Sequence, residues 1–371
     1  MVILLGTAAA VVTIAGVKAT AWLLAPTLLA LVIVITIGPV HRWLRVHRVP
    51  AWAATLALIV LVYGVIVGFS LVVIVSLAKL ATLLPQYASR FDELVSGATD
   101  LLARFGVGSG QLNQVASSLD LGKLLSYLGS VLGAVTGLAS SLVFLLALLL
   151  FLSVEAAGFD DRMAAITSYR PNAATALREF AIRTRRYVVV TTIFGVIVAV
   201  LDTIALAIIE IPLAVLWGLL SFVTNYIPNV GFVLGLLPPA LLGLLTGGWR
   251  DMVIVIAVYC VFNLVVQSLI QPYYVGDAVG LSATVTFLAL VFWAWILGPL
   301  GAILAIPVTL LVKSTFVDID PGAGWIAALF HLSSGDSERE RAPAPKGRNG
   351  GLRRLMAKRA AAAAAPAATE E

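Results

Sequence analysis

VVVTTIFGVIVAVLDTIALA, residues 188–207, is the stretch that decides the fold. Asp202 is the only charged residue in it. Since a helix rises about 1.5 Å per residue, a segment of this length crosses the hydrocarbon core of a bilayer, which is about 30 Å thick. Backbone polar groups in hydrocarbon need internal partners, so the segment is predicted to be a transmembrane helix.

The composition of the whole chain agrees with this prediction. Of its 371 residues, 61% are hydrophobic and 12% are charged, whereas soluble domains hold about 45–50% apolar and about 25% charged residues. The period-two alternation of a membrane barrel is absent, which favours an all-α integral membrane protein. The N-terminus lacks the basic segment and cleavage site of a signal peptide and is predicted to begin the first span.

The same length criterion predicts about eight transmembrane helices. Simple spans are expected near 3–17, 21–40, 51–78, 131–153, 188–209 and 252–272. Two further apolar stretches, 211–248 and 281–312, are too long for one crossing and contain Pro/Gly breaks, which predicts two re-entrant segments in the C-terminal half. The membrane domain is therefore expected to cover residues 1–315.

The distribution of charge predicts the orientation. Short loops rich in Lys and Arg lie on the cytoplasmic side, and the predicted loops 41–50 and 154–187 contain Arg42, Arg45, Arg48, Arg162, Arg170, Arg178, Arg183, Arg185 and Arg186. The interval 79–130 balances its charges and carries apolar residues at helical spacing, so an extracytoplasmic amphipathic helical insert is expected there. Both termini are then cytoplasmic, and the basic tail 316–371 is predicted to be mostly disordered.

The first broken stretch contains Asn225, Pro228, Asn229 and Gly231. Pro228 removes a backbone donor, and Gly231 permits a sharp bend. In lipid, such a break persists only where it is buried in protein or lines a wet cavity. The two asparagines favour the wall of a substrate path, and a simple proline kink is the alternative.

The second broken stretch contains Gly298, Pro299 and Gly301. Two Gly/Pro-interrupted segments in one half of a chain are typical of the discontinuous helices that form midplane sites in secondary transporters. We therefore assign these three residues to the same substrate path. The neighbouring Trp293 and Trp295 are also explained as anchors at the membrane interface.

Three amides follow one another in the predicted seventh span. Asn263, Gln267 and Gln271 recur at every fourth residue and so share one face of an α-helix. They are expected to offer hydrogen bonds to a polar solute, or alternatively to join neighbouring helices.

Two acids, Asp202 and Glu210, lie in or beside the fifth span. Acids inside a membrane are rare and usually functional, so both are candidates for ion or proton coupling. The alternatives are an ion pair for Asp202 with a basic cluster on another helix, and simple exposure to water for Glu210.

Several functional classes have no support in the sequence. The chain lacks a nucleotide-binding loop and a Ser/His or paired-His arrangement, so no enzyme activity, cofactor or metal site is predicted. The single cysteine, Cys260, lies in an apolar run and is expected to be a packed thiol. The net charge of +5 comes from helix ends and the tail, which indicates membrane topology rather than binding of nucleic acid.

The C-terminal blocks resemble the autoinducer-2 exporter family of bacterial permeases. The resemblance is carried by Asn225–Gly231 with Pro238-Pro239, by Pro272 with Val275-Gly276 and Val279–Ser282, and by Val291–Gly301 through Ile306-Pro307 and Lys313. It implies an exporter in the bacterial inner membrane, assembled as a homo-oligomer, with re-entrant hairpins in the C-terminal half.

The expected function is export of a small polar solute, with the quorum-sensing signal autoinducer-2 as the leading candidate, and the lipid bilayer as surroundings. A sodium/proton-type cation antiporter is the alternative. Many members of the family carry an acid shortly before the residue matching Pro272, whereas residues 266–271 read VQSLIQ here. This departure leaves Asp202 as the main candidate for cation coupling.

Overall fold

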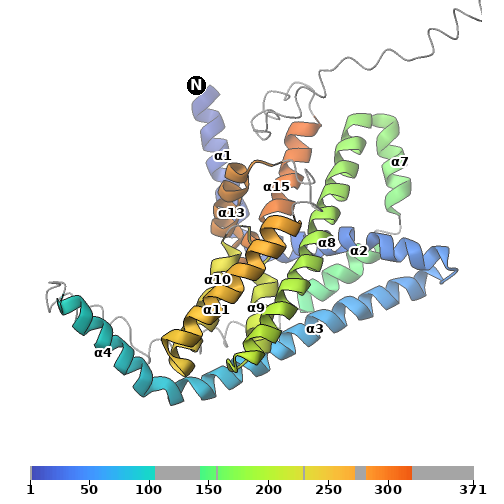
Figure 1. The fold of residues 1–371 in the computed structure, drawn as a ribbon. Coiled ribbons are helices and arrows are strands. Elements are labelled where there is room, and N and C mark those ends of the chain that lie inside the picture. Colours follow the sequence, from blue (N-terminus) through green and yellow to red (C-terminus); the bar gives the residue numbers. More distant parts are fainter. Residues whose placement is uncertain (1, 105–142, 156–157, 229, 272–280, 320–371) are drawn as a thin grey trace, which may run out of the picture.

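A computed structural model describes residues 2–104, 143–155, 158–228, 230–271 and 281–319, and these residues form helices without any strand (Figure 1). The N-terminal helices are α1 (Val2–Ala19), α2 (Ala21–Val46), α3 (Ala51–Leu83), the 3₁₀ turn η1 (Leu84–Tyr87) and α4 (Ala88–Arg104). They are followed by the helix Val143–Glu155, α7 (Phe159–Tyr169) and α8 (Pro171–Ile208). The C-terminal half contains α9 (Ala214–Thr224), α10 (Gly231–Gly247), α11 (Trp249–Phe262), the π-helix η2 (Asn263–Ile270), α13 (Ala283–Leu297), α14 (Pro299–Ile303), α15 (Ala305–Lys313) and the π-helix η3 (Ser314–Asp318).

Four of the described helices are long and apolar enough to cross a membrane. They cover Ala21–Val46, Trp52–Gly97, Pro171–Ile208 and Trp249–Gln267. Shorter apolar helices, among them α1, α9, α10 and α13, accompany them. The all-helical membrane fold is thus confirmed, and the count of eight crossings stays a prediction. Residues 131–142, the insert beyond Arg104 and the tail from 320 onward lie outside the described residues.

Several helices are longer than the sequence analysis predicted. The predicted loop 41–50 is helical as far as Val46, because arginine is a good helix former. The helix ends where Arg48 takes a positive φ of 62°, shortly before Pro50. Most of the predicted loop 154–187 is likewise helical, in α7 and the first half of α8.

One expectation about packing was wrong. Cys260 on α11 is exposed rather than packed in a core. In a membrane protein an apolar side chain gains from facing lipid, so an exposed thiol on an apolar helix needs no internal partner.

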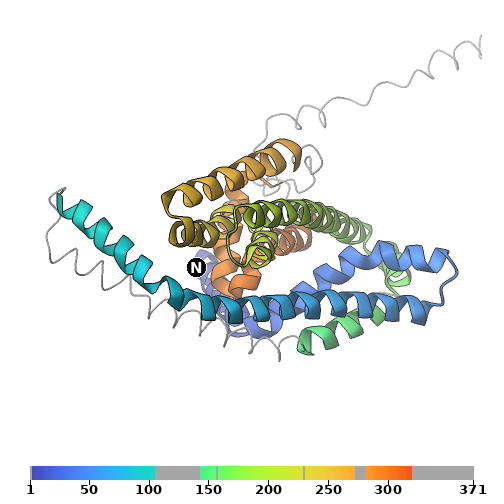
Figure 2. The same cartoon turned by 60° about the horizontal axis from the view of Figure 1, so that its bottom comes forward.

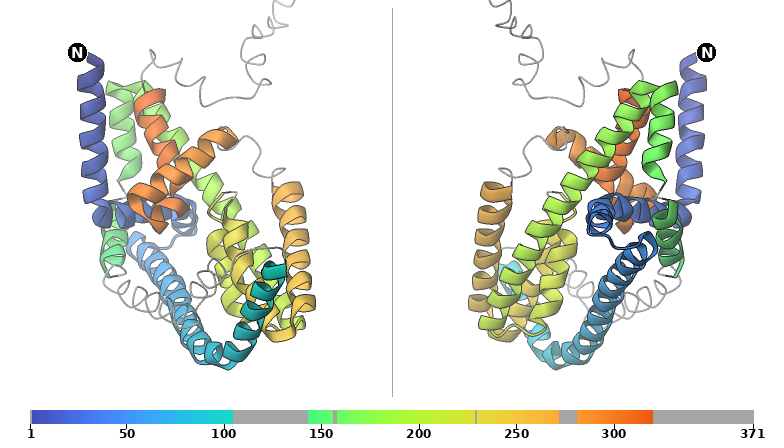
Figure 3. Two further views of the ribbon diagram at one scale, coloured as in Figure 1. Left: turned by 90° about the vertical axis from the view of Figure 1, so that its left-hand side faces the viewer. Right: turned by 90° about the vertical axis from the view of Figure 1, so that its right-hand side faces the viewer.

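Helix α8 is the axis around which the rest is arranged (Figure 3). Its first half packs on α2, α7 and α15, and Phe180 and Tyr187 join a core with Ile306 and Leu310. Its second half packs on α9 and α11, where Leu206 joins a different core. Figure 2 looks onto α3, which runs along one side of the molecule beside α2. The two halves of α8 therefore pack against different sets of helices.

Helices α9 and α10 form an antiparallel hairpin against α8 and α11. The turn between Thr224 and Gly231 joins them. The start of α9 lies near the end of α8, and the end of α10 lies near the start of α11 (Figures 1 and 3). With 11 residues, α9 is only about 16 Å long. Its close approach to α8 depends on Gly218, because a Cβ at this position would overlap Thr203 Oγ1.

Candidate functional site

A small cavity of about 20 Å³ lies where α8, the α9–α10 hairpin, α11 and η2 meet. Its polar lining comes from seven side chains: Asp202, Ser221, Thr224, Asn225, Tyr259, Asn263 and Gln267. Val198, Phe232 and Gly235 complete the wall. Four of the residues predicted from the sequence, namely Asp202, Asn225, Asn263 and Gln267, are thus brought together from α8, the hairpin turn and η2.

One side of the cavity is a chain of amide hydrogen bonds. Gln267 Nε2 donates to Asn225 Oδ1 at 2.7 Å, and Asn225 Nδ2 donates to the Thr191 carbonyl at 3.0 Å. This chain connects η2, the start of the hairpin turn and α8. The amides therefore do join helices, as the alternative reading in the sequence analysis proposed, and they do so at the edge of a cavity.

The other side of the cavity is a group of buried polar atoms without well-formed hydrogen bonds. Asp202 is 1% exposed. Among the described residues, neither of its carboxyl oxygens has a partner at hydrogen-bond geometry, and the same holds for Ser221 Oγ, Tyr259 Oη and Asn263 Oδ1. Ser221 nevertheless lies close enough to Asp202 and Tyr259 to interact with both. The alternative of an ion pair between Asp202 and a basic cluster has no support in the described part of the chain.

A buried polar group of this kind suits a small guest, which ranges from one water molecule to an ion or a polar solute. Buried polar atoms are nearly always hydrogen-bonded, and an unpaired one indicates bound water, an ion or a functional role. A cavity of about 10–15 Å³ already holds one water molecule, so the present space fits a single small guest. Hydroxyl and amide groups together with one carboxyl group suit a hydroxyl-bearing solute or a cation.

Local sequence explains how the hairpin tip is held. Tyr187 Oη donates to the Tyr226 carbonyl at 3.3 Å, and the Tyr226 and Thr192 hydroxyls are 2.6 Å apart. Pro228 lies in the turn itself, and at Gly231 a Cβ would overlap the Thr224 carbonyl oxygen. The turn therefore needs a glycine for its tight return into α10. Asn229 lies outside the described residues.

Only two of the three predicted amides line the cavity. Asn263 and Gln267 belong to the π-helix over residues 263–270 and both face the cavity, whereas Gln271, one residue beyond this π-helix, does not line it. Glu210 is also not part of the site, because it is exposed in the turn after α8 with a positive φ of 64°.

The second broken segment, at Gly298–Gly301, lies away from the cavity at Asp202. Gly298 has a φ of 71° between α13 and α14, Pro299 begins α14, and a Cβ on Gly301 would overlap the Trp293 carbonyl oxygen. Trp293 Nε1 donates to Thr309 Oγ1 at 3.0 Å, so this tryptophan joins α13 to α15. These helices pack on α2 and the first half of α8, whereas the cavity lies beside the second half.

Several polar residues at or beside the site were not predicted from the sequence. Thr184, Tyr187 and Thr191 lie on the same buried face of α8 as the predicted Asp202. Their spacing of three, four and eleven residues is helical, and this polar stripe was a readable signal. Ser221 and Tyr259 are isolated hydroxyls in apolar helices and gave no such signal. Among the described residues, no three His, Cys, Asp or Glu side chains gather as a metal site.

Comparison with known proteins identifies the family. The profile of the AI-2E family transporters matches residues 7–319. The chain is 30% identical to the AI-2 transport protein TqsA of Escherichia coli K12, over 82% of this chain and 88% of that protein. It is 31% identical to a protein of Haemophilus influenzae Rd, over 84% and 90%, and 24% identical to YhhT of Escherichia coli K12, over 89% and 94%. The names of the last two assign them to transport only provisionally.

These relatives are bacterial, and the apolar helices make the chain a multi-pass protein of the bacterial inner membrane. The resemblance carried by the C-terminal motifs is confirmed. The chain belongs to the AI-2E family of transporters.

Proposed function

We propose that this transporter exports a small, polar, uncharged solute past the cavity at Asp202, with autoinducer-2 as the leading candidate. The observation that carries the proposal is the set of buried polar atoms without well-formed hydrogen bonds around that cavity. The name of TqsA as an AI-2 transport protein supports the choice of candidate. A hydroxyl-rich furanone would pair with the hydroxyls of Ser221 and Tyr259 and with the Asn263 oxygen.

The substrate path in this proposal follows the hairpin. It includes Asn225, Pro228, Asn229 and Gly231 of the turn segment, and Asn263 and Gln267 on the facing helix. Gln271, which the sequence also suggested, does not line the cavity and is left out of the path. The hairpin is the re-entrant part of the stretch 211–248 and enters from the outer side of the membrane. Gly298, Pro299 and Gly301 contribute by fixing the bend that packs α13–α15 against the first half of α8.

Passage of a solute requires movement of the hairpin. The cavity holds about one water molecule, so it is closed to a furanone ring. Opening it requires α9 and α10 to move away from α8 and η2, which breaks the hydrogen bonds of Asn225. Discontinuous helices at such positions in transporters open and close the substrate site.

Efflux measurement with a matched pair of amide variants tests the proposal. Labelled autoinducer-2 is loaded into cells that lack the transporter and are complemented with wild type, Gln267→Ala or Gln271→Ala. Efflux should fall with Gln267→Ala and stay near wild type with Gln271→Ala, because only Gln267 lines the cavity. Equal efflux from cells with and without the transporter would exclude this solute. Equal loss in both variants would exclude this path.

A cation/proton antiporter is the second candidate. The observation that favours it is Asp202, a buried carboxyl group whose two oxygens have no partner at hydrogen-bond geometry in the described part of the chain. Proton flux driven by sodium in everted vesicles tests it, with Asp202→Asn as the variant and the exposed Glu210→Gln as control. Asp202→Asn should abolish the flux while Glu210→Gln leaves it. Identical flux in wild type and Asp202→Asn would rule out exchange at this residue.

The remaining features of the assembly follow from the same proposal. Eight crossings, both termini in the cytoplasm, an extracytoplasmic insert over 79–130 and a disordered tail over 316–371 fit the distribution of charge. A homo-oligomer would cover part of the apolar surface of α3, on which Leu56, Val60 and Leu61 are exposed.

A further inference from the structure

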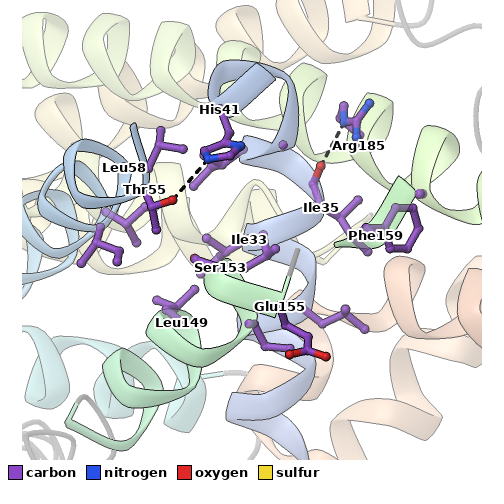
Figure 4. Close-up of a pocket in the computed structure, with 18 of the residues that line it drawn as sticks. Ile33, Ile35, His41, Thr55, Leu58, Leu149, Ser153, Glu155, Phe159 and Arg185 are labelled. Carbon is purple, nitrogen blue, oxygen red and sulfur yellow. Dashed lines mark hydrogen bonds between the residues drawn. The ribbon is translucent and has the colours of Figure 1, made fainter. Parts of the chain in front are cut away.

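A second and larger cavity lies far along α8 from the candidate site. It has a volume of about 390 Å³ and is lined by α2, α3, the helix Val143–Glu155, the start of α7 and the first half of α8. This volume lies in the range of about 300–1,000 Å³ that is typical of sites for small molecules. Figure 4 shows the cavity with ten of its lining residues labelled. None of these residues has a role in the proposed transport site.

Most of the cavity wall is apolar. Aliphatic side chains such as Val34, Leu58, Val62 and Leu149 line its body, together with Phe180. A water-filled apolar space of this size is unfavourable, because each square ångström of apolar surface gains about 25 cal/mol on removal from water. The body of the cavity therefore suits an aliphatic chain.

One part of the wall is basic. Arg45, Arg162 and Arg185 line the cavity together with His41, and Glu155 is the only acid among the described lining residues. Glu155 forms an ion pair with Arg162. Three arginines against one acid give the described wall a net positive charge, which favours an anion.

The basic groups are held in position by the helices around them. Arg185 Nε donates to the Ile35 carbonyl at 3.0 Å, and its guanidinium group passes across Gly38, where a Cβ would lie 3.5 Å from Arg185 Nη2. His41 Nε2 and Thr55 Oγ1 are 3.2 Å apart, which joins α2 to α3 at the same wall. Figure 4 shows both contacts. Arg185 and His41 are thus fixed by neighbouring helices, whereas Arg45 is an exposed side chain on the same wall.

From this arrangement we propose that the cavity binds a membrane phospholipid with an anionic headgroup. The headgroup lies at Arg45 and Arg185, and one acyl chain occupies the apolar body. Basic pockets between transmembrane helices on the cytoplasmic side characteristically bind acidic lipids. The arginine-rich segments 41–50 and 154–187 are the ones that the charge distribution assigns to that side.

Native mass spectrometry of the full-length protein tests this proposal. The protein is reconstituted in nanodiscs with equal amounts of phosphatidylglycerol and phosphatidylcholine and then released with its bound lipids. Wild type should retain phosphatidylglycerol in preference to phosphatidylcholine. Arg45→Gln should lower retention about fivefold, since one arginine near a lipid headgroup contributes about that factor.

Two further variants locate the site. Leu58→Trp fills the apolar body without changing the charge and should lower retention at least as much as Arg45→Gln. It keeps the test decisive if Arg45→Gln does not fold. Arg178→Gln is the matched control, because Arg178 lies two turns before Arg185 on α8, is exposed and does not line the cavity. Its retention should equal that of wild type.

Four outcomes would overturn the proposal. Equal retention of the two lipids would exclude selection for an anion, and equal loss in Arg178→Gln would indicate diffuse surface charge. Unchanged retention in Leu58→Trp would place the lipid elsewhere. Displacement of the lipid by millimolar glycerol phosphate would show that the site takes a free anion without an acyl chain.

Discussion

The contact between Gln267 and Asn225 should contribute a measurable coupling free energy to folding. Gln267→Ala removes one hydrogen bond and leaves Asn225 Oδ1 without its donor. Asn225→Ala removes this bond and also the bond to the Thr191 carbonyl. Because one bond is shared, the double variant loses the same two bonds as Asn225→Ala alone.

The expected loss of unfolding free energy in each variant follows from the number of hydrogen bonds it removes and from how deeply those bonds are buried. A lost hydrogen bond destabilises a soluble protein by about 1 kcal/mol, and polar contacts between membrane helices average about 0.6 kcal/mol. Both side chains are only partly buried. We therefore expect losses of about 0.6–1 kcal/mol for Gln267→Ala and about 1.2–2 kcal/mol for Asn225→Ala, with a coupling of about 0.6–1 kcal/mol.

Reversible unfolding in mixed micelles with rising detergent fraction gives the free energies of the double-mutant cycle. The matched control is a second cycle that combines Asn225→Ala with Gln271→Ala, which changes the same type of side chain one turn further on. Its coupling should be near zero. Distant sites add to within about 0.3–0.5 kcal/mol, so a Gln267–Asn225 coupling inside that range would refute the contact.

Two more predictions concern packing and charge. Gly218→Ala should destabilise the protein by about 1–3 kcal/mol through overpacking against Thr203. Gly64→Ala is the control: nothing lies within 4 Å of the new methyl group, so this variant should be neutral or stabilising by up to about 1 kcal/mol. Thermal unfolding monitored by intrinsic fluorescence compares the two variants, and equal Tm values would contradict the close crossing of α8 and α9. Asp318→Asn should destabilise by about 1–3 kcal/mol, because Lys313 is 5% exposed and its ammonium lies 2.9 Å from that carboxylate. Lys313→Met in the Asp318→Asn background should recover part of the loss in the same assay, and a further loss would show that the lysine has another anionic partner.

The hairpin turn and the buried acid of the candidate site could be predicted from the sequence. Pro228 and Gly231 break an apolar stretch, and this alone places a turn at residues 225–230 and brings Asn225 to its edge. Asp202 was identifiable because an acid in an apolar span is rare. These inferences rest on the local cost of a missing donor or a buried charge, which tertiary packing cannot remove.

Other features depend on tertiary structure and could not be predicted. Gly298 and Gly301 form a break like that at Gly231, yet they belong to helices on the other half of α8. Sequence shows that a helix is broken and not which neighbour it packs against. The hydroxyl of Tyr259 reaches the cavity only because of the crossing of α11 with α8, which is also fixed by packing.

The hydrogen bonds at the hairpin tip also set how readily the proposed path can open. Four of them connect the turn to α8 and η2: two from Asn225 and two from Tyr226. At about 0.6 kcal/mol each, they hold the closed state by about 2 kcal/mol. A tenfold ratio corresponds to about 1.4 kcal/mol, so these bonds alone limit the open state to at most roughly 2–4%, and loss of the packing between α8 and α9 lowers that population further.

This population is suitable for a transporter. Minor states of roughly 0.1–10% are those that a ligand shifts by binding them more tightly. A solute that pairs with Ser221, Tyr259 and Asn263 in the open state would offset the lost bonds with new ones. In the proposed path, the polar atoms at one side of the cavity and the paired amides at the other would then act together, because the substrate would replace the contacts that its entry breaks.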